Sequence, residues 1–294
     1  MNKINLLLAS FAISLSVYGQ QIPPSNDPTV PSPVYEASLN LDNAPERINQ
    51  SLPLYDQHNK DGWVLLTEYS DEFESKSLNQ TKWYPNNPGW KGRQPTYFHE
   101  SNVEIEDGYA VFSINKHGDE KLPEGYTHSS GFLVSKQKHL YGYFEARLKA
   151  NDSPWVFGFW MTNVDKDWWT EIDICENCPY PKGYEHNLNS NVHVFRSPID
   201  QGNVKEHFAD PKKYYLPFDL GDDFHTWGLD WTKDYIRFYF DGVLFREIKN
   251  THWHQELEIN LNNESNKWLG ALPDGGDYSD EKYLVDYVRV WKRK

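Results

Sequence analysis

The sequence predicts an all-β domain built as an antiparallel sandwich or jelly roll. Short segments that alternate between apolar and polar residues recur at even spacing over residues 102–291, as expected for strands whose side chains point to two faces in turn. Turn sequences such as Glu106-Asp107-Gly108 and Asp241-Gly242 join neighbouring segments; such turns close hairpins. Helical periodicity is absent from the same region. Two packed antiparallel sheets are therefore the expected architecture.

The expected strands follow one another along most of the chain. They span residues 102–105, 109–114, 131–134, 141–149, 156–162, 191–195, 224–231, 235–240, 243–248 and 284–291. A further strand is expected around the acidic residues 171–176. One face of one sheet has to curve in order to form a concave cleft, and a short helix is expected near residues 211–215.

Two segments precede this domain. Residues 1–19 resemble a secretory signal, because Lys3 supplies a positive charge and residues 4–17 are apolar, so we expect export to the periplasm or the cell exterior. No cysteine stands directly after the signal, so a lipoprotein is not expected, and no later run of about 18 apolar residues predicts a membrane span. Residues 20–61 are rich in Pro, Ser, Asn and Asp and are expected to form a linker or arm that wraps the domain at 62–294.

Charge and cysteine content limit the possible partners. The net charge of −14 argues against nucleic acid, because phosphate binding needs a basic surface. An anionic polysaccharide remains possible, since a few arginines inside a cleft can bind sulfate or carboxylate. The two cysteines, Cys175 and Cys178, cannot complete a four-ligand zinc site. They are expected to form a local disulfide or to remain inert thiols.

The run Glu171-Ile172-Asp173-Ile174-Cys175-Glu176 places three carboxylates along one expected strand. Alternation puts Glu171 and Asp173 on one face, while the two isoleucines mark the buried face. Continued alternation would turn Glu176 into the core, where an unpaired carboxylate costs several kcal/mol. A one-residue β-bulge after Asp173 shifts the phase and returns Glu176 to the open face.

This acidic row has the layout of a retaining glycosidase, which needs two carboxyl groups roughly 5 to 5.5 Å apart. We assign Glu171 as the nucleophile, Glu176 as the acid/base, and Asp173 as the partner that holds the nucleophile and shares its proton. Repulsion among three close acids should raise the pKa of at least one of them. The alternative is a merely solvated strand face, but this would not need the surrounding large aromatic residues, which are Trp155, Phe157, Phe159, Trp160, Trp168 and Trp169.

Four segments together resemble glycoside hydrolase family 16. They are residues 141–147 (Tyr-Gly-Tyr-Phe-Glu-Ala-Arg), the E-x-D-x-x-E run, residues 225–227 (His-Thr-Trp), and residues 285–290 (Val-Asp-Tyr-Val-Arg-Val). The resemblance covers about residues 62–294 and implies a concanavalin-type β-jelly roll with endo-acting, retaining hydrolysis and no catalytic cofactor. Agarases, porphyranases, carrageenases and laminarinases share the longer acidic variant. Asp286 resembles the carboxylate that often supplies a structural calcium site in this family.

Trp90-Lys91-Gly92-Arg93 resembles the W-x-G-R segment of the agarase and porphyranase branch. In that branch the tryptophan stacks on a galactose-type ring and the arginine contacts a polar or sulfated unit. An indole face matches the C–H face of a sugar, and a guanidinium can hold a sulfate through two hydrogen bonds. The alternative is a loop tryptophan that packs on its own domain beside an exposed arginine.

Further residues are candidates for substrate contacts. Trp155 is expected to be a sugar platform, and Trp160 is either a platform or a core residue. His193 alternates out of the face formed by its valine neighbours, so it either shares the cleft with the acids or is a structural histidine. Arg196 and Glu264 are candidate contacts at the rim of the cleft.

The resulting hypothesis is an exported, monomeric endo-hydrolase of β-1,4 galactosidic bonds in a red-algal galactan, with porphyran preferred to agarose because of Arg93. A laminarinase acting on β-glucan shares the acidic run, but laminarinases usually carry a W-P-A-type segment where this chain has Ser153-Pro154-Trp155. The alternative from another class is a carbohydrate-binding lectin built on the same sandwich, which would not need to retain all three acids.

Overall fold

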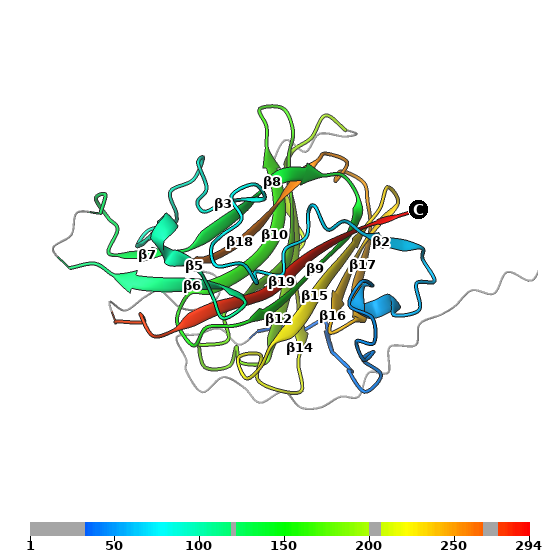
Figure 1. Ribbon diagram of the computed structural model, residues 1–294, viewed down its shortest axis with the longest axis horizontal. Coiled ribbons are helices and arrows are strands. Elements are labelled where there is room, and N and C mark those ends of the chain that lie inside the picture. Colours follow the sequence, from blue (N-terminus) through cyan, green and yellow to red (C-terminus); the bar gives the residue numbers. More distant parts are fainter. Residues whose placement is uncertain (1–32, 119–121, 200–206, 267–275) are drawn as a thin grey trace, which may run out of the picture.

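The computed structural model describes residues 33–118, 122–199, 207–266 and 276–294. The expected signal at 1–19 and the first part of the arm, 20–32, lie outside these residues. Within them the chain forms nineteen strands and two 3₁₀ helices, η1 (Leu54–Asp56) and η2 (Glu100–Asn102). Two large sheets lie face to face (Figure 1), so the all-β jelly-roll prediction is confirmed. No helix among the described residues is long and apolar enough to cross a membrane.

The first sheet carries the acidic run. Its strand order is β1-β14-β12-β11-β10-β18-β8-β3, with β13 paired to β12. The bounds are β1 (Ala37–Ser38), β14 (Lys212–Tyr215), β12 (Asn187–Arg196), β11 (Trp169–Asn177), β10 (Val156–Val164), β18 (Leu257–Glu264), β8 (Phe132–His139), β3 (Trp83–Tyr84) and β13 (Phe208–Ala209).

The second sheet covers the inner face of the first. Its order is β17-β16-β15-β9-β19-β6-β7-β4, with β2 paired to β19 and β5 paired to β6. The bounds are β17 (Val243–Lys249), β16 (Tyr235–Phe240), β15 (His225–Trp231), β9 (Gly142–Lys149), β19 (Lys282–Arg293), β6 (Tyr109–Lys116), β7 (His128–Ser130), β4 (Thr96–Phe98), β2 (Trp63–Leu65) and β5 (Val103–Glu106).

Several details differ from the sequence prediction. The sheets are antiparallel except for the parallel pairs β1–β14 and β4–β7. The helix expected near residues 211–215 is wrong, because this segment forms β14, which pairs with β12 on one side and β1 on the other. Strand β18 was not among the expected strands, since its asparagines disfavour a strand on propensity alone.

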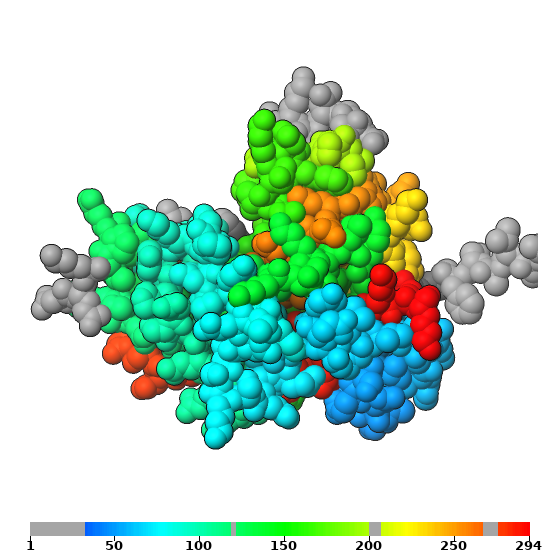
Figure 2. All heavy atoms as spheres, turned by 45° about the horizontal axis from the view of Figure 1, so that its top comes forward, coloured from blue at the N-terminus to red at the C-terminus, as the bar shows by residue number. Residues whose placement is uncertain are grey.

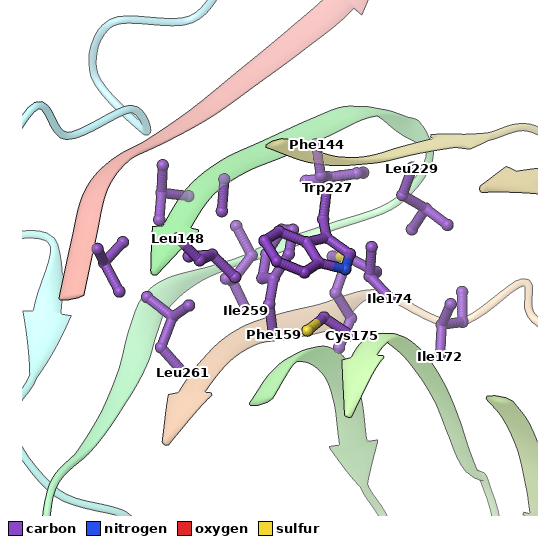
Figure 3. Close-up of a cluster of buried hydrophobic side chains, with 14 of the residues drawn as sticks. Phe144, Leu148, Phe159, Ile172, Ile174, Cys175, Trp227, Leu229, Ile259 and Leu261 are labelled. Carbon is purple, nitrogen blue, oxygen red and sulfur yellow. The ribbon is translucent and has the colours of Figure 1, made fainter. Parts of the chain in front are cut away.

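The hydrophobic core lies between the two sheets. Alternation along β9 and β15 turns Phe144, Leu148, Trp227 and Leu229 inward, and these side chains are fully or almost fully buried. Figure 3 shows them opposite inward side chains of the first sheet, which are Phe159, Ile172, Ile174, Cys175, Ile259 and Leu261. The core therefore fixes which face of β11 is left for the acids.

The described part of the arm, residues 33–61, lies against both sheets. Its strand β1 extends the first sheet beside β14. Further along, Arg47 forms an ion pair with Glu145, a buried residue on the outer face of the second sheet. The Leu54 backbone N–H donates to Glu145 Oε2 at 2.8 Å, and the Tyr287 hydroxyl donates to Oε1 at 3.0 Å. A buried carboxylate is thus satisfied largely by the arm.

Arg47→Ala is expected to destabilise the protein, because it leaves the Glu145 carboxylate buried without its cation. Removing one partner of a buried ion pair costs about 3 kcal/mol, which corresponds to a fall in Tm of about 6–12 °C for a domain of this size. Thermal unfolding followed by circular dichroism measures the change. Lys212→Ala, which removes an exposed pair with Glu36, is the matched control and should cost less than about 1 kcal/mol. Equal effects of the two substitutions would contradict this account of the arm.

Candidate active site

A cleft of about 890 Å³ crosses the outer face of the first sheet. Side chains from β12, β11, β10, β18, β8 and β3 line it, together with residues of the loop at 87–93. In Figure 2 the cyan segment around residue 90 stands apart from the taller green segment of the chain. The cleft therefore has the acidic strand in its floor and the tryptophan loop as one wall.

The predicted bulge in the acidic strand is confirmed. Along the β10–β11 pair, Phe159 lies opposite Cys175, whereas the next residue, Trp160, lies opposite Asp173. Ile174 is therefore the extra residue of β11 and has no partner on β10. An inserted residue of this kind reverses the in/out phase of every residue that follows it on the strand.

The change of phase sorts the side chains of β11 between core and cleft. Ile174 and Cys175 are adjacent, yet both are fully buried in the core. The carboxylates of Glu171, Asp173 and Glu176 all line the cleft. A strand without the bulge would place Glu176 in the core, so the bulge brings the three acids to one face.

The two cysteines do not form a disulfide. Cys175 and Cys178 are free thiols, and both are buried, which agrees with the inert-thiol alternative. Burial raises the pKa of the Cys178 thiol to about 12, so it stays protonated and unreactive at neutral pH.

Burial and like charges act together on Glu171. Desolvation raises the pKa of the Glu171 carboxyl well above its ordinary value, and the carboxylates of Asp173, Glu176 and Glu264 raise it further, while a hydrogen bond with Thr162 lowers it. This agrees with the repulsion expected among the three acids. A proton is therefore readily held within the acidic row at neutral pH.

His193 lies beside the acidic row. Its Nε2 is 3.1 Å from Asp173 Oδ2 and 3.9 Å from Glu171 Oε1. The same nitrogen is 2.8 Å from Asn191 Nδ2, and the other ring nitrogen, Nδ1, is 2.7 Å from His207 Nε2. Both ring nitrogens of His193 therefore have neighbours within hydrogen-bond distance, and the imidazole lies beside Glu171 and Asp173.

Stacked rings form the wall of the cleft on the β12 side. Trp169 stacks on Phe195 with ring centroids 4.0 Å apart, and Phe195 stacks on His207 at 4.2 Å. All three residues line the cleft. Arg196 lies over the Trp169 ring, 5.1 Å from its centroid, and its Nε donates to the Asp165 carbonyl. Arg196 therefore contacts the wall through Trp169 and is not itself among the lining residues.

The opposite wall contains the tryptophan loop. Trp90 and Arg93 line the cleft, and the Arg93 guanidinium lies 5.8 Å from the centroid of the Trp90 ring. Arg93 Nε donates to Glu264 Oε2 at 3.1 Å. Trp160 also lines the cleft, where its Nε1 donates to Asn262 Oδ1 at 2.7 Å. Burial raises the pKa of the Glu264 carboxyl, and the nearby Arg93 opposes this shift.

The sugar platform expected at Trp155 is wrong in this structure. The Trp155 side chain is fully buried, and its Nε1 donates to Thr96 Oγ1 at 2.8 Å. The indole packs against the rings of His128 and Tyr278. No face of the ring is open to a sugar, because the ring fills the space between neighbouring segments of its own domain.

Asp286 lies on β19, away from the cleft. Its Oδ2 accepts a hydrogen bond from Arg147 Nη1 at 2.9 Å, and calcium at this position stays a prediction. Within the described residues, three potential metal-binding side chains come within 4.8 Å of one another at Glu171, Asp173 and His193. These three residues belong to the acidic row and its histidine neighbour described above, and we assign no metal to them.

Sequence reasoning missed the asparagines that surround Glu176. Asn266 Nδ2 donates to Glu176 Oε1 at 2.9 Å, and Asn189 Nδ2 donates to the Glu176 carbonyl at 3.0 Å. Asn262 is buried beneath Trp160 and lines the cleft. A signal for them was present: residues 187–191 and 260–266 repeat asparagine, which strands disfavour, and its recurrence indicates a polar role.

The comparisons with known proteins agree with this geometry. Residues 63–293 match the family model described as beta-porphyranase A-D, GH16 domain. Beta-porphyranase B of Zobellia galactanivorans is 29% identical over 78% of this chain and 85% of that protein. Its crystal structure superposes with a TM-score of 0.69 over 78% of this chain and 92% of that chain.

A relative named for another polysaccharide is similar to nearly the same degree. Kappa-carrageenase of Pseudoalteromonas carrageenovora is 28% identical over 78% of this chain and 64% of that protein. Pairwise identity therefore leaves the substrate open, whereas the family match covers almost all of the domain described above. The chain belongs to the beta-porphyranase A–D family of glycoside hydrolase family 16 domains.

Proposed function

We propose that the protein is an exported, monomeric endo-glycosidase that cleaves β-1,4 galactosidic bonds in a red-algal galactan with retention of configuration. The observation that carries this proposal is the bulged strand β11, which turns Glu171, Asp173 and Glu176 into one cleft. In this mechanism Glu171 attacks the anomeric carbon while Glu176 gives its proton to the departing oxygen. Glu176 then removes a proton from the water that releases the sugar, and no cofactor takes part.

Asp173 and His193 have a defined task in this mechanism. The nucleophile must be ionised when it attacks, yet burial and repulsion favour a proton on Glu171. Asp173, the residue assigned to share that proton, lies on the same face of β11, and His193 Nε2 lies 3.9 Å from Glu171 Oε1 and 3.1 Å from Asp173 Oδ2. We assign them to keeping the nucleophile charged and correctly oriented.

Charge in the cleft supports a sparsely sulfated galactan over a densely sulfated one. Its lining contains two basic side chains, Arg93 and Lys138, and each pairs with an acid. Glu264 accepts a hydrogen bond from Arg93 Nε, and we assign the Arg93 guanidinium beside Trp90 to the contact with a sulfate. On this basis porphyran is the preferred substrate and agarose the alternative. A laminarinase-type β-glucanase is the second candidate, because β-glucan needs no cation in the cleft.

Glu171→Gln and Glu176→Gln should each lower the release of reducing ends from porphyran by about 10³-fold or more, because a nucleophile or an acid/base is lost. Substrate binding, measured by affinity electrophoresis in porphyran gels, should persist in both variants. A parallel panel with agarose, carrageenan and laminarin distinguishes the galactanase from the glucanase. Full activity in either variant would exclude this mechanism.

Arg93→Ala should reduce kcat/KM for sulfated porphyran oligosaccharides by about 10-fold or more beyond its effect on neutral agarose oligosaccharides, as expected for lost charge-assisted hydrogen bonds. Since this substitution also leaves Glu264 without its partner, the double variant Arg93→Ala/Glu264→Gln serves as the matched control. The sulfate preference should be lost in both variants. Equal losses on the two substrates would remove the argument for sulfate at Arg93.

Glu171→Gln should raise Tm at pH 8 and leave it unchanged at pH 4. The pKa of Glu171 is raised in the folded protein above its ordinary value of 4.5. At pH values between the pKa of the unfolded chain and that of the folded protein, only the unfolded chain releases the proton. The free energy of unfolding therefore falls as pH rises through this range. Glutamine does not ionise, and each kcal/mol gained corresponds to about 2–4 °C. Thermal unfolding at several pH values, with the exposed Glu104→Gln as control, measures the difference in Tm between the variant and the unsubstituted protein. A difference in Tm that stays constant with pH would contradict this assignment.

A further inference from the structure

The side chain of Glu176 is held by a residue from a different part of the first sheet. Asn266 lies two residues beyond the end of β18, and its Nδ2 donates to Glu176 Oε1 at 2.9 Å. The Asn266 side chain is fully buried. A buried amide with a short, direct hydrogen bond to a carboxylate restricts the carboxylate to one orientation.

The segment that presents Asn266 is itself fixed. The Ser265 hydroxyl donates to the Arg93 carbonyl at 2.6 Å, and the Ser130 hydroxyl donates to the Asn263 carbonyl at 2.6 Å. Both serines are fully buried. The position of the amide is therefore set by hydrogen bonds of the residues just before it, Asn263 and Ser265, which join this segment to β7 and to the tryptophan loop.

Other residues fix the backbone of Glu176 and shape its surroundings. Asn189 Nδ2 donates to the Glu176 carbonyl at 3.0 Å, so the main chain is held independently of the side chain. The residue opposite Glu176 on β10 is Gly158, where a Cβ would lie 2.7 Å from Asn262 Oδ1. The missing side chain at this position lets the Asn262 amide approach the backbone of β10 closely.

We propose that Asn266 is a positioning residue for the acid/base: its N–H engages Oε1 of Glu176 and fixes the orientation in which the carboxyl group gives and takes the proton. This inference rests on the retaining mechanism proposed above. In the first step Glu171 bonds to the anomeric carbon, the C–O bond to the departing sugar breaks, and the Glu176 proton passes to the departing oxygen, which leaves Glu176 as a carboxylate. In the second step Glu176 takes a proton from water, whose oxygen bonds to the anomeric carbon as the bond to Glu171 breaks. The N–H donor favours the charged form that exists between the two steps.

Other charged groups also face Glu176. Glu171 and Asp173 lie on its own strand, Glu264 lies on β18, His193 lies on β12, and Arg93 lies in the loop of the opposite wall. Gly158, its partner on β10, carries no charge. Removal of the Asn266 donor leaves these groups in place.

The test compares two substrates that differ in their need for an acid. Porphyran requires protonation of its leaving group, whereas a dinitrophenyl β-glycoside of a porphyran oligosaccharide does not. Asn266→Ala should lower kcat/KM for porphyran by about 10- to 100-fold, within the range of general acid catalysis, and kcat/KM for the aryl glycoside by less than about 3-fold. The basic limb of the porphyran pH profile should move about one unit upward, and Asn266→Asp should move it in the same direction because of like-charge repulsion.

Two control variants distinguish a failure of the Asn266 assignment from a failure of the proposed mechanism. Glu176→Ala should show the same separation between substrates to a greater degree, with azide restoring turnover of the aryl glycoside. Asn102→Ala removes another buried asparagine, which bonds Ser113, and should affect both substrates equally. Equal losses on both substrates in Asn266→Ala, without a shift of the basic limb, would overturn the role of Asn266. The absence of the separation in Glu176→Ala would instead overturn the proposed mechanism.

Discussion

The chemistry of this domain depends on one inserted residue, Ile174. Strand side chains alternate strictly, so a strand that buries Ile172 and Ile174 cannot also present Glu171, Asp173 and Glu176 on its other face without a change of phase. The bulge supplies that change, and the core responds by accepting Cys175 directly after Ile174. The apolar contacts that keep Ile174 and Cys175 in the core therefore also keep the three acids in the cleft.

Once three acids share a face, the rest of the cleft has to manage their charge. Repulsion and burial favour a proton on one of the three acids. The residues on the two sides of the acidic row make different contacts with it. On one side His193 lies close to Glu171 and Asp173, whereas on the other Asn266 donates to Glu176. The basic groups of the opposite wall are already engaged by acids. Hydrogen bonds, more than an excess of cations, therefore compensate the negative charge of the acids in the cleft.

Much of the fold and the acidic row could be predicted from sequence, because both follow from alternation, which is local. The bulge at Ile174 was predictable for the same reason, as a one-residue conflict between burial and charge. Trp155 was misjudged because exposure depends on segments far along the chain, such as Thr96 and Tyr278. Asn266 was missed because its partner Glu176 lies ninety residues away, and no local pattern joins them. The pairing of residues 212–215 with β1 and β12 likewise overrode the helix expected there.

Strand β19 has a consequence for how the domain assembles. It runs from Lys282 to Arg293, yet it lies in the interior of the second sheet, between β9 and β6. The earlier strands of that sheet therefore have a gap in their ladder until the final stretch of the domain has left the ribosome. Native structure is completed only after synthesis of this strand, since non-local pairing of this kind has a high loop-closure cost and is slow. For the export proposed above, such late closure is an advantage, because a sheet that lacks its central strand does not hold the chain in a compact state before it crosses a membrane.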